Sequence, residues 1–265
     1  MKVTVLASGS KGNCCYVEGD SGALLIDVGI SAKETLRRLE CAGADKDRIS
    51  AILVTHEHSD HIRGVDVLAR RLSVPVTGTH GTIWEFEAYL NKTNKSGKPK
   101  ILPMMETHRV TEKFDINGFS VEMFSTYHDA CDPSGFCIRE GDTVFGFCTD
   151  TGRLTEKIRE KLAKCDGIVL ESNHCPHMLE HGKYPVFLKQ RIRDPDRGHL
   201  SNESASECLK CIGCDSGQVI LAHLSEENNT PEKAREMAAL GLGLYYEEES
   251  LHIAKQHEIS ASIVL

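Results

Sequence analysis

Residues 55–61 of the chain read THEHSDH and concentrate side chains that bind divalent metal ions. Four candidate ligands fall within this segment, namely His56, His58, Asp60 and His61. Charged imidazoles so close together would repel one another, and neutral ones buried without partners would be costly. A metal ion resolves both problems, because neutral imidazole and ionised carboxylate are its natural ligands. A hydrolytic zinc ion takes three protein ligands plus water, so four ligands in one loop favour two ions over a polar loop that is His-rich by chance.

Three more candidate ligands follow apolar runs that are typical of β-strands. These runs cover residues 119–125, 143–148 and 219–222, and the ligands after them are His128, Asp150 and His223. A single histidine or aspartate at the end of a strand usually has no function. Three of them, together with the four-ligand loop, favour one shared metal site at the ends of the strands.

The remaining chain alternates strand-like and helix-like segments. Further strands are expected at 3–7, 14–18, 23–27, 51–54, 74–76, 136–139 and 167–171. Helices are expected at 31–41, 65–72, 155–163 and 202–212, with another beginning at Thr230. This alternation predicts a layered α/β (α+β) sandwich. Because strands resume on both sides of the polar stretch 91–100, we interpret it as a surface loop and expect residues 1–265 to form a single domain.

The composition bears on how the protein could bind nucleic acid and on the compartment in which we expect it. The 31 basic and 39 acidic residues give a net charge of −8, which argues against binding to nucleic acid through bulk positive charge. A local basic groove remains compatible with a nucleic-acid enzyme. The eleven cysteines are odd in number and include the adjacent pair Cys14 and Cys15, which suits reduced thiols. Without an export signal or an apolar run of about 18 residues, we expect a cytoplasmic protein with no membrane partner.

Together these motifs resemble the metallo-β-lactamase-fold hydrolases. The resemblance rests on Asp27 in LLIDVG, on THEHSDH, on His128, on Asp150 in TDTG and on His223, in this order along the chain. It implies a four-layer αββα sandwich with a dinuclear metal site at its edge. In such a site one ion would be held by His56, His58 and His128, and the other by Asp60, His61 and His223. Asp150 would bridge the two ions, and Asp27 would support the ligand loop without binding metal.

Longer motifs are similar to the WalJ/YycJ branch of this family, namely LASGSKGNCCYVE, HDACDPSGF, ESNH, RGHLSN and AHLSEENNTPEKA. Membership of this branch implies a bacterial, cytoplasmic 5′→3′ exonuclease that acts on double-stranded DNA. We therefore expect a hydrolase with two divalent ions (Zn, Mn or Fe), DNA as its substrate and no organic cofactor. The same site is compatible with a small-molecule hydrolase, either a cyclic phosphodiesterase or a lactone or thioester hydrolase, and with a non-catalytic metal-binding scaffold.

Three features favour a phosphodiester substrate. The glycine-rich turn 8–13 can present N–H groups to an anion, with Ser10 and Asn13 as candidate substrate-binding residues, or it is an ordinary hairpin turn. Residues 183–199 carry five basic and two acidic side chains, so they form either a basic groove or a solvated loop. His199 in RGHLSN is either a loop histidine or a residue that protonates the leaving oxygen or holds a phosphate oxygen. With Asp60, it completes the candidate catalytic residues.

Overall fold

The computed structural model describes residues 1–94, 101–212, 217–260 and 262–265, in which the strands form two mixed sheets. The first sheet contains, in spatial order, β14 (Ile263–Val264), β1 (Lys2–Ala7), β2 (Cys14–Glu18), β3 (Ala23–Ile26), β4 (Ile49–Leu53), β5 (Val76–Thr79) and β6 (Met105–His108). The second contains β13 (Leu251–Ile253), β12 (Gln218–Ala222), β11 (Gly167–Glu171), β10 (Thr143–Cys148), β9 (Ser134–Glu140), β8 (Phe119–Ser125) and β7 (Lys113–Ile116). Each sheet changes from antiparallel to parallel pairing along its width, at β3 and at β10.

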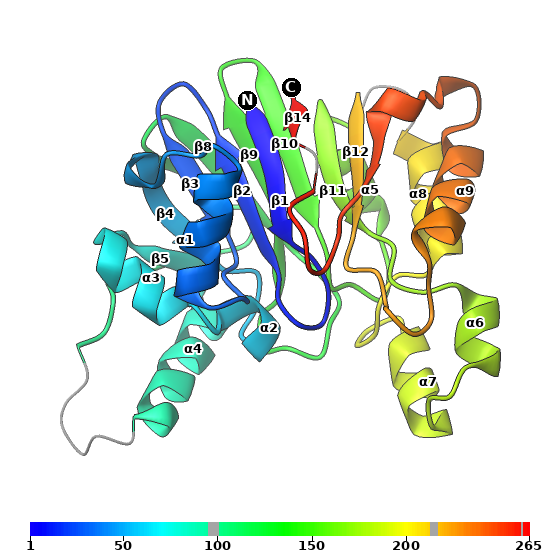
Figure 1. Ribbon diagram of the computed structural model, residues 1–265, viewed down its shortest axis with the longest axis horizontal. Coiled ribbons are helices and arrows are strands. Elements are labelled where there is room, and N and C mark those ends of the chain that lie inside the picture. Colours follow the sequence, from blue (N-terminus) through cyan, green and yellow to red (C-terminus); the bar gives the residue numbers. More distant parts are fainter. Residues whose placement is uncertain (95–100, 213–216, 261) are drawn as a thin grey trace.

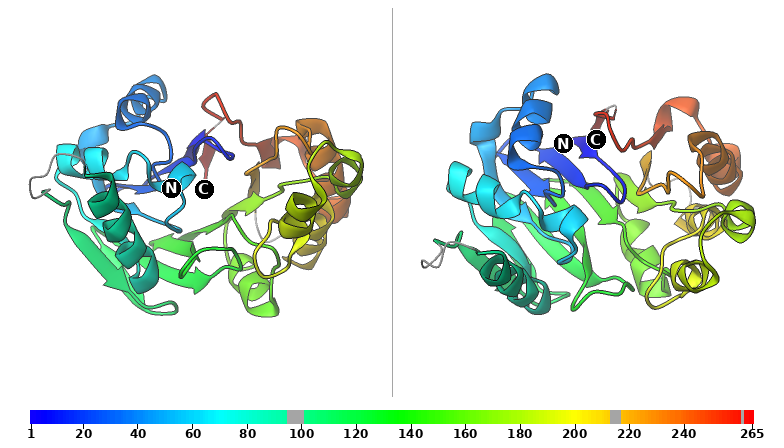
Figure 2. Two further views of the ribbon diagram at one scale, coloured as in Figure 1. Left: turned by 90° about the horizontal axis from the view of Figure 1, so that it is seen from below. Right: turned by 60° about the horizontal axis from the view of Figure 1, so that its bottom comes forward.

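Helices cover the outer face of each sheet. The first sheet is covered by α1 (Ala32–Cys41), α3 (Val65–Leu72) and α4 (His80–Thr93), and the second by α5 (Glu156–Leu162), α8 (Asn202–Ile212) and α9 (Pro231–Leu242). One cluster of buried apolar side chains lies between each sheet and its helices, and a third fills the space between the two sheets. The layers therefore follow the order helix, sheet, sheet, helix, and the expected αββα sandwich is confirmed (Figures 1 and 2).

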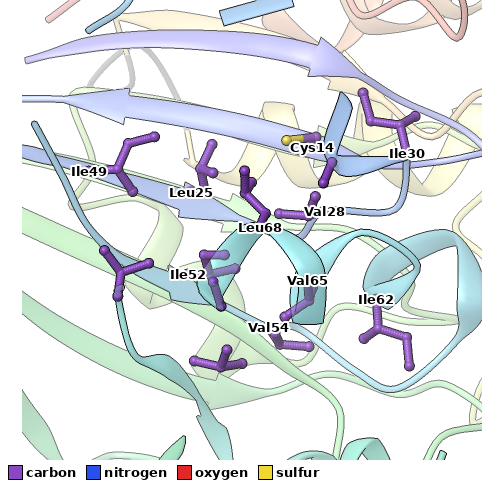
Figure 3. Packing of buried hydrophobic residues seen from close by; sticks show 14 of the residues in the cluster. Cys14, Leu25, Val28, Ile30, Ile49, Ile52, Val54, Ile62, Val65 and Leu68 are labelled. Carbon is purple, nitrogen blue, oxygen red and sulfur yellow. The ribbon is translucent and has the colours of Figure 1, made fainter. Parts of the chain in front are cut away.

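The strands of the first sheet are apolar on both faces because both faces are covered. In β3, Leu25 joins the cluster under the helices, whereas Leu24 and Ile26 join the cluster between the sheets. This alternation follows from the two-residue repeat of a strand, and burial on both faces explains the continuous apolar run. Figure 3 shows the helix side of this packing, with Leu25 of β3 close to Leu68 of α3.

The shorter elements lie in the connections. α2 (Ser59–Ile62), α6 (Pro176–His181) and α7 (Val186–Arg193) lie in the lower part of Figure 1, and α6 and α7 belong to the connection between β11 and α8. Three short 3₁₀ turns are η1 (Lys46–Arg48), η3 (Gly243–Tyr245) and η4 (Glu248–Ser250). Within the described residues, no helix is both long and apolar enough to cross a membrane.

Most of the expected elements are present, and several differences need correction. The strand expected at 74–76 starts only at Val76, since Pro75 has no N–H to donate to the ladder. Residues 80–93 form α4, which we did not predict, although Ile83, Phe86 and Leu90 are buried at helical spacing. The loop expected at 91–100 is therefore wrong for 91–93, which end this helix, and residues 95–100 lie outside the described part of the chain. Two helices, α6 and α7, also occupy the region between 176 and 193 where we had predicted none.

Candidate metal centre

The THEHSDH segment follows β4 and turns at once into α2. His58 is the residue before this helix, and the His61 N–H donates to the His58 carbonyl oxygen at 2.9 Å. The turn places the imidazoles together: the ring centres of His56 and His61 are 4.0 Å apart, and those of His56 and His58 are 4.6 Å apart. The loop thus brings its own ligands together, and the start of β9 supports it, since the Ser134 N–H donates to the Thr55 carbonyl oxygen at 3.0 Å.

Asp27 holds this loop in place. Its carboxylate accepts hydrogen bonds from the Thr55 N–H and from the Thr55 hydroxyl, each at 2.8 Å, and from His61 Nδ1 at 2.7 Å. Asp27 is fully buried, so a metal ion is not needed to explain its charge: three donors already satisfy it. The supporting role that the resemblance implied for Asp27 agrees with these contacts.

The other predicted ligands come from the second sheet. His128 follows β8, Asp150 follows β10 and His223 follows β12. Asp150 lies between the others: its Oδ2 is 3.4 Å from His61 Nε2, and its Oδ1 is 3.8 Å from His128 Nε2 and 3.4 Å from His223 Nδ1. The structure therefore brings all the predicted metal ligands into one buried cluster at the edge of both sheets.

Backbone strain marks the strand ends that carry these side chains. Asp27, Asp150 and His223 adopt positive φ angles of 57°, 55° and 56°, in the left-handed region that residues other than glycine seldom occupy. Such conformations cost on the order of 1–3 kcal/mol each and persist at functional sites where the surroundings enforce them. All three residues are buried at the cluster. The strain is consistent with side chains that must point in one direction.

The hydrogen bonds of the imidazoles show what the cluster is built to hold. In each ring one nitrogen contacts the surrounding chain: His56 Nδ1 lies 3.0 Å from the Thr55 hydroxyl, His58 Nε2 3.2 Å from the Asp129 carbonyl, His128 Nδ1 3.1 Å from the Gly198 carbonyl, His61 Nδ1 2.7 Å from Asp27 and His223 Nδ1 3.0 Å from Glu171. Carbonyl and carboxylate oxygens accept, so these nitrogens donate, and the opposite nitrogen carries a lone pair. Metal-binding histidines are oriented in this way.

The lone pairs face one another. His56 Nε2 and His58 Nδ1 are 3.1 Å apart, and two lone pairs at that distance repel unless a proton or a metal ion lies between or beside them. In the described part of the chain, His223 Nε2 and Asp150 Oδ2 are buried without a hydrogen-bond partner. The donor atoms form compact groups within 4.8 Å, among them His56, His58 and His128 in one group and Asp60, His61 and His223 in another. These residues fit divalent metal ions.

Glu171 is the functional residue that our sequence analysis missed. It ends β11 and is fully buried, and its Oε1 accepts from His199 Nδ1 at 2.8 Å and from His223 Nδ1 at 3.0 Å. Its Oε2 accepts from the Thr151 N–H at 2.9 Å and the Leu200 N–H at 3.1 Å. Glu171 thus orients one predicted metal ligand and the predicted catalytic His199. The available signal was an acidic residue at the end of an otherwise apolar strand.

Charges within the cluster shift the pKa values of its members. Burial raises the pKa of Asp60 and of Glu171, but the neighbouring imidazoles outweigh burial and hold both pKa values well below their usual range. Burial also lowers the pKa of His56, and the other imidazoles lower it further. For His61 burial acts in the same direction, yet Asp27 and Asp150 raise its pKa to about 9. The carboxylates are therefore ionised, as metal ligands must be.

A cleft of about 170 Å³ opens onto the cluster. It is lined by Ser10, Asn173, Tyr184, Leu188, Arg191, Ile192, His199, His223, Leu224 and Ser225. Ser10 is exposed at its mouth. Asn13 is buried: its Oδ1 accepts from the Gly9 N–H at 2.8 Å, and its Nδ2 lies 3.0 Å from His61 Nε2. Asn13 therefore ties the glycine-rich turn to the metal loop, and its contact with substrate stays a prediction, as does that of Ser10.

The chain is similar to known proteins over most of its length. A family model described as a β-lactamase superfamily domain matches residues 23–224. The chain is 37% identical over 237 residues to exodeoxyribonuclease WalJ of Streptococcus pneumoniae serotype 2, and the aligned region covers 88% of this chain and 85% of WalJ. It is 34% identical over 257 residues to exodeoxyribonuclease YycJ of Bacillus anthracis, which covers 97% and 93% of the two chains.

Among solved structures, the metallo-β-lactamase fold protein YhfI of Bacillus subtilis matches with a TM-score of 0.70 and 15% identity, over 99% of this chain and 98% of YhfI. This match supports the fold alone, whereas the two exodeoxyribonucleases are similar in sequence over most of their length. The family model, the sequence relatives and the fold neighbour all point to the same superfamily. The chain belongs to the β-lactamase superfamily, in the branch that contains the exodeoxyribonucleases WalJ and YycJ.

Proposed function

We propose that the protein is a metal-dependent exodeoxyribonuclease that cleaves phosphodiester bonds from the 5′ ends of double-stranded DNA. The observation that carries the proposal is the set of imidazole lone pairs and carboxylates that converge at the sheet edge, with each ring held by the chain through its other nitrogen. The names of the similar proteins WalJ and YycJ support DNA as the substrate. The polarity is the one that the resemblance to this branch implies.

We further propose two divalent ions, of Zn, Mn or Fe. His56, His58 and His128 would hold one, Asp60, His61 and His223 would hold the other, and Asp150 would contact both. Bound together, such ions lower the pKa of a shared water and neutralise charge on an attacked phosphate. The ligand set contains no cysteine, which admits all three metals. No organic cofactor is needed for this chemistry.

The chain contributes His199 to the same cleft. Glu171 holds its Nδ1 at 2.8 Å, so Nε2 is the nitrogen that remains for substrate. The leaving oxygen must take up a proton as its bond to phosphorus breaks, and an imidazolium whose Nδ1–H is held by Glu171 can donate the proton on its Nε2. We assign this role to His199 and assign Asp60 to the ligand group next to the attacked phosphate. Glu171 orients His199 and the metal ligand His223 and contacts neither substrate nor metal in this arrangement, so it is a positioning residue.

The size of the cleft favours a large substrate over a small one. Pockets for small organic ligands measure roughly 300–1,000 Å³, whereas the cleft at this site measures about 170 Å³. It has room for a phosphodiester group but leaves most of a substrate outside, against the surrounding surface. That surface includes residues 183–199, with five basic and two acidic side chains. Both features support a nucleic acid over a lactone or thioester.

The extent and the location of the enzyme are part of the proposal. The predicted ligands span residues 56–223 and come from both sheets, which supports a single domain for residues 1–265. The ten cysteines in the described residues are all free, which is usual in a reducing compartment and supports a cytoplasmic location.

The test uses purified protein loaded with Mn²⁺ or Zn²⁺ and linear duplex DNA that is labelled at the 5′ end in one sample and at the 3′ end in another. We expect early release of short products from the 5′ label, and no release with the His58→Ala variant. If the DNA stays intact with every metal while bis-p-nitrophenyl phosphate is hydrolysed, the protein is a small-molecule phosphodiesterase instead. Early release from the 3′ label would overturn the proposed polarity.

A further inference from the structure

Helix α7 presents large apolar side chains to solvent beside the cleft. Phe187 is 71% exposed and Val186 is 70% exposed, although Ile192 on the same helix is buried. No other phenylalanine in the described part of the chain is exposed. Figure 1 shows α7 in its lower part, beyond α8 and the sheets. An exposed ring next to a reactive site is typical of a surface that contacts a large ligand.

The helix is tied firmly to the metal centre. The His199 N–H donates to the Ile192 carbonyl oxygen at 2.9 Å, and His128 Nδ1 donates to the Gly198 carbonyl oxygen at 3.1 Å. Arg191 Nε donates to Asp129 Oδ2 at 3.0 Å, and Asp129 Oδ1 lies 3.3 Å from His128 Nε2. The position of α7 is thus fixed relative to a predicted ligand and to the predicted catalytic histidine.

Phe187 shares a face of α7 with a residue of the cleft. It precedes Arg191 by four residues, and side chains at this spacing lie on the same side of a helix. Arg191 lines the cleft together with Leu188 and His199. Phe187 therefore lies one helical turn from Arg191 on the same side of α7, next to the cleft that Arg191 lines.

The charge of this region fits a polyanion. Residues 183–197 contain Lys183, Lys189, Arg191, Arg193 and Arg197 against Asp194 and Asp196, so the segment has a net charge of 5 − 2 = +3 in a chain of net charge −8. Arg191 and Arg193 are paired with Asp129 and Glu180, and Lys183, Lys189 and Arg197 add positive charge beyond these pairs. An exposed ring within a locally basic surface is the combination by which proteins bind unpaired nucleotides, since bases stack on the ring while cations contact the backbone. A second copy of this acidic chain would be attracted less.

We propose that Phe187 stacks on the terminal base of the DNA substrate and separates the end of the duplex as one strand enters the cleft. The inference rests on the proposed function. The cleft of about 170 Å³ has room for the backbone of one strand only, so opening the terminal pair would free that strand to enter it. Unpaired bases lose stacking, and an aromatic side chain replaces it.

The test compares Phe187→Leu, which keeps an apolar side chain without the ring, with Phe187→Trp, which keeps a ring. Val186→Ala is the matched control, because Val186 is equally exposed but lies about 100° away around the helix. On blunt duplex DNA we expect kcat/KM to fall about tenfold for Phe187→Leu and by less than about twofold for the other two. On the same DNA with three unpaired nucleotides at the 5′ end, the loss should be smaller. Hydrolysis of bis-p-nitrophenyl phosphate should be unchanged in all variants.

Several results would overturn the inference. If the wild-type protein and the Phe187→Leu variant digest blunt duplex DNA with the same kcat/KM, the stacking role is contradicted while the proposed function stands. Equal losses for Val186→Ala, or a loss on bis-p-nitrophenyl phosphate, would also contradict a role specific to the ring. No digestion of DNA by the wild-type protein, with bis-p-nitrophenyl phosphate hydrolysed, would remove both proposals together.

A second readout does not depend on turnover. DNA with 5-iododeoxyuridine at its 5′ end should, on irradiation, form a cross-link that maps to the peptide containing Phe187. Cross-links confined to other segments would contradict the stacking contact. A dimer in sedimentation that Phe187→Leu dissociates would show that the exposed ring serves a second copy of the chain instead.

Discussion

The two halves of the proposed metal centre contain similar candidate ligands but are supported differently. His56, His58 and His128 are backed by neutral groups, namely the Thr55 hydroxyl and the carbonyls of Asp129 and Gly198. In the group of Asp60, His61 and His223, the two histidines are backed by the buried carboxylates of Asp27 and Glu171. A carboxylate behind a histidine makes the ring a stronger ligand. The comparison indicates that the carboxylate-backed half binds its ion more tightly.

The two halves also differ in the charge that they carry when no metal is bound. Burial and the surrounding imidazoles lower the pKa of His56, and burial lowers that of His128, so these two rings of the neutral-backed half are uncharged without metal. Asp27, Asp60, Asp150 and Glu171 concentrate negative charge in and around the other half. Against the effect of burial, these carboxylates raise the pKa of His61 to about 9 and raise the pKa of His223, so protons on the two imidazoles offset part of that charge when no metal is bound. Buried carboxylates are stable only when they are paired. We therefore expect the metal ion of the carboxylate-backed half to contribute more to the stability of the fold.

The largest effect is expected where the two halves meet. Asp150 contacts ligands of both, so Asp150→Asn should lower DNA hydrolysis by at least about 10³-fold, because it removes a charge shared by both ions. Metal content, measured by plasma mass spectrometry, should fall for both ions. Retention of full activity by the variant would contradict a bridging role, provided that circular dichroism shows a folded protein.

Removal of metal is the next test of the comparison. Stepwise chelation should release one ion readily and a second only at higher chelator concentration, since the halves differ in ligand support. Complete removal should lower the midpoint of thermal unfolding, because an ion at 1,000 times its Kd stabilises the folded state by about 4 kcal/mol. Calorimetry at each chelation step would show the second ion to be the more stabilising one. Equal release and equal stabilisation would contradict the asymmetry.

Variants of the groups behind the histidines test the difference between the two halves. Glu171→Gln keeps the shape but removes the charge behind His223, and we expect metal affinity in that half to fall about 10- to 100-fold. Thr55→Ser keeps the hydroxyl that contacts His56 and should change the affinity of the other half little. Isothermal titration of the metal-depleted proteins measures both. Glu171→Gln should also depress kcat through His199, and an unchanged kcat at saturating metal would contradict that positioning role.

The smallest effect is expected far from both halves. On α1, Arg37 and Arg38 lower the pKa of Glu34 to about 2. A lowered pKa in the folded state contributes stability above the unfolded value of about 4.3, and that contribution is lost as the pH falls toward 2. Because Glu34 is one-third exposed, the contribution is below about 1 kcal/mol. Glu34→Gln should therefore lower the free energy of unfolding slightly at neutral pH in urea titrations, with no difference from the wild-type protein near pH 2, and leave metal affinity unchanged. A change in metal affinity would show that the variant disturbs more than α1.

The sequence predicted the loop-borne ligands more directly than the others. THEHSDH is contiguous, so residue type and spacing alone indicated a metal site. His128, Asp150 and His223 were found because each follows an apolar strand, but their convergence depends on the pairing of two sheets, which no local pattern encodes. Glu171 was missed because its role arises only when β11 lies between β10 and β12. α7 was read only as a basic segment, since its helix is short and exposes apolar residues that periodicity expects to be buried.

The central claim is that two ions occupy two unlike halves of one centre. Anomalous X-ray scattering from crystals grown with Mn²⁺ or Zn²⁺ tests it directly. The account predicts two peaks, one among His56, His58 and His128 and one among Asp60, His61 and His223, with Asp150 between them and a higher occupancy at the second. A single peak, or a peak among Asp150, Glu171, His199 and His223, would contradict the account, because Glu171 would then be a ligand and not a support.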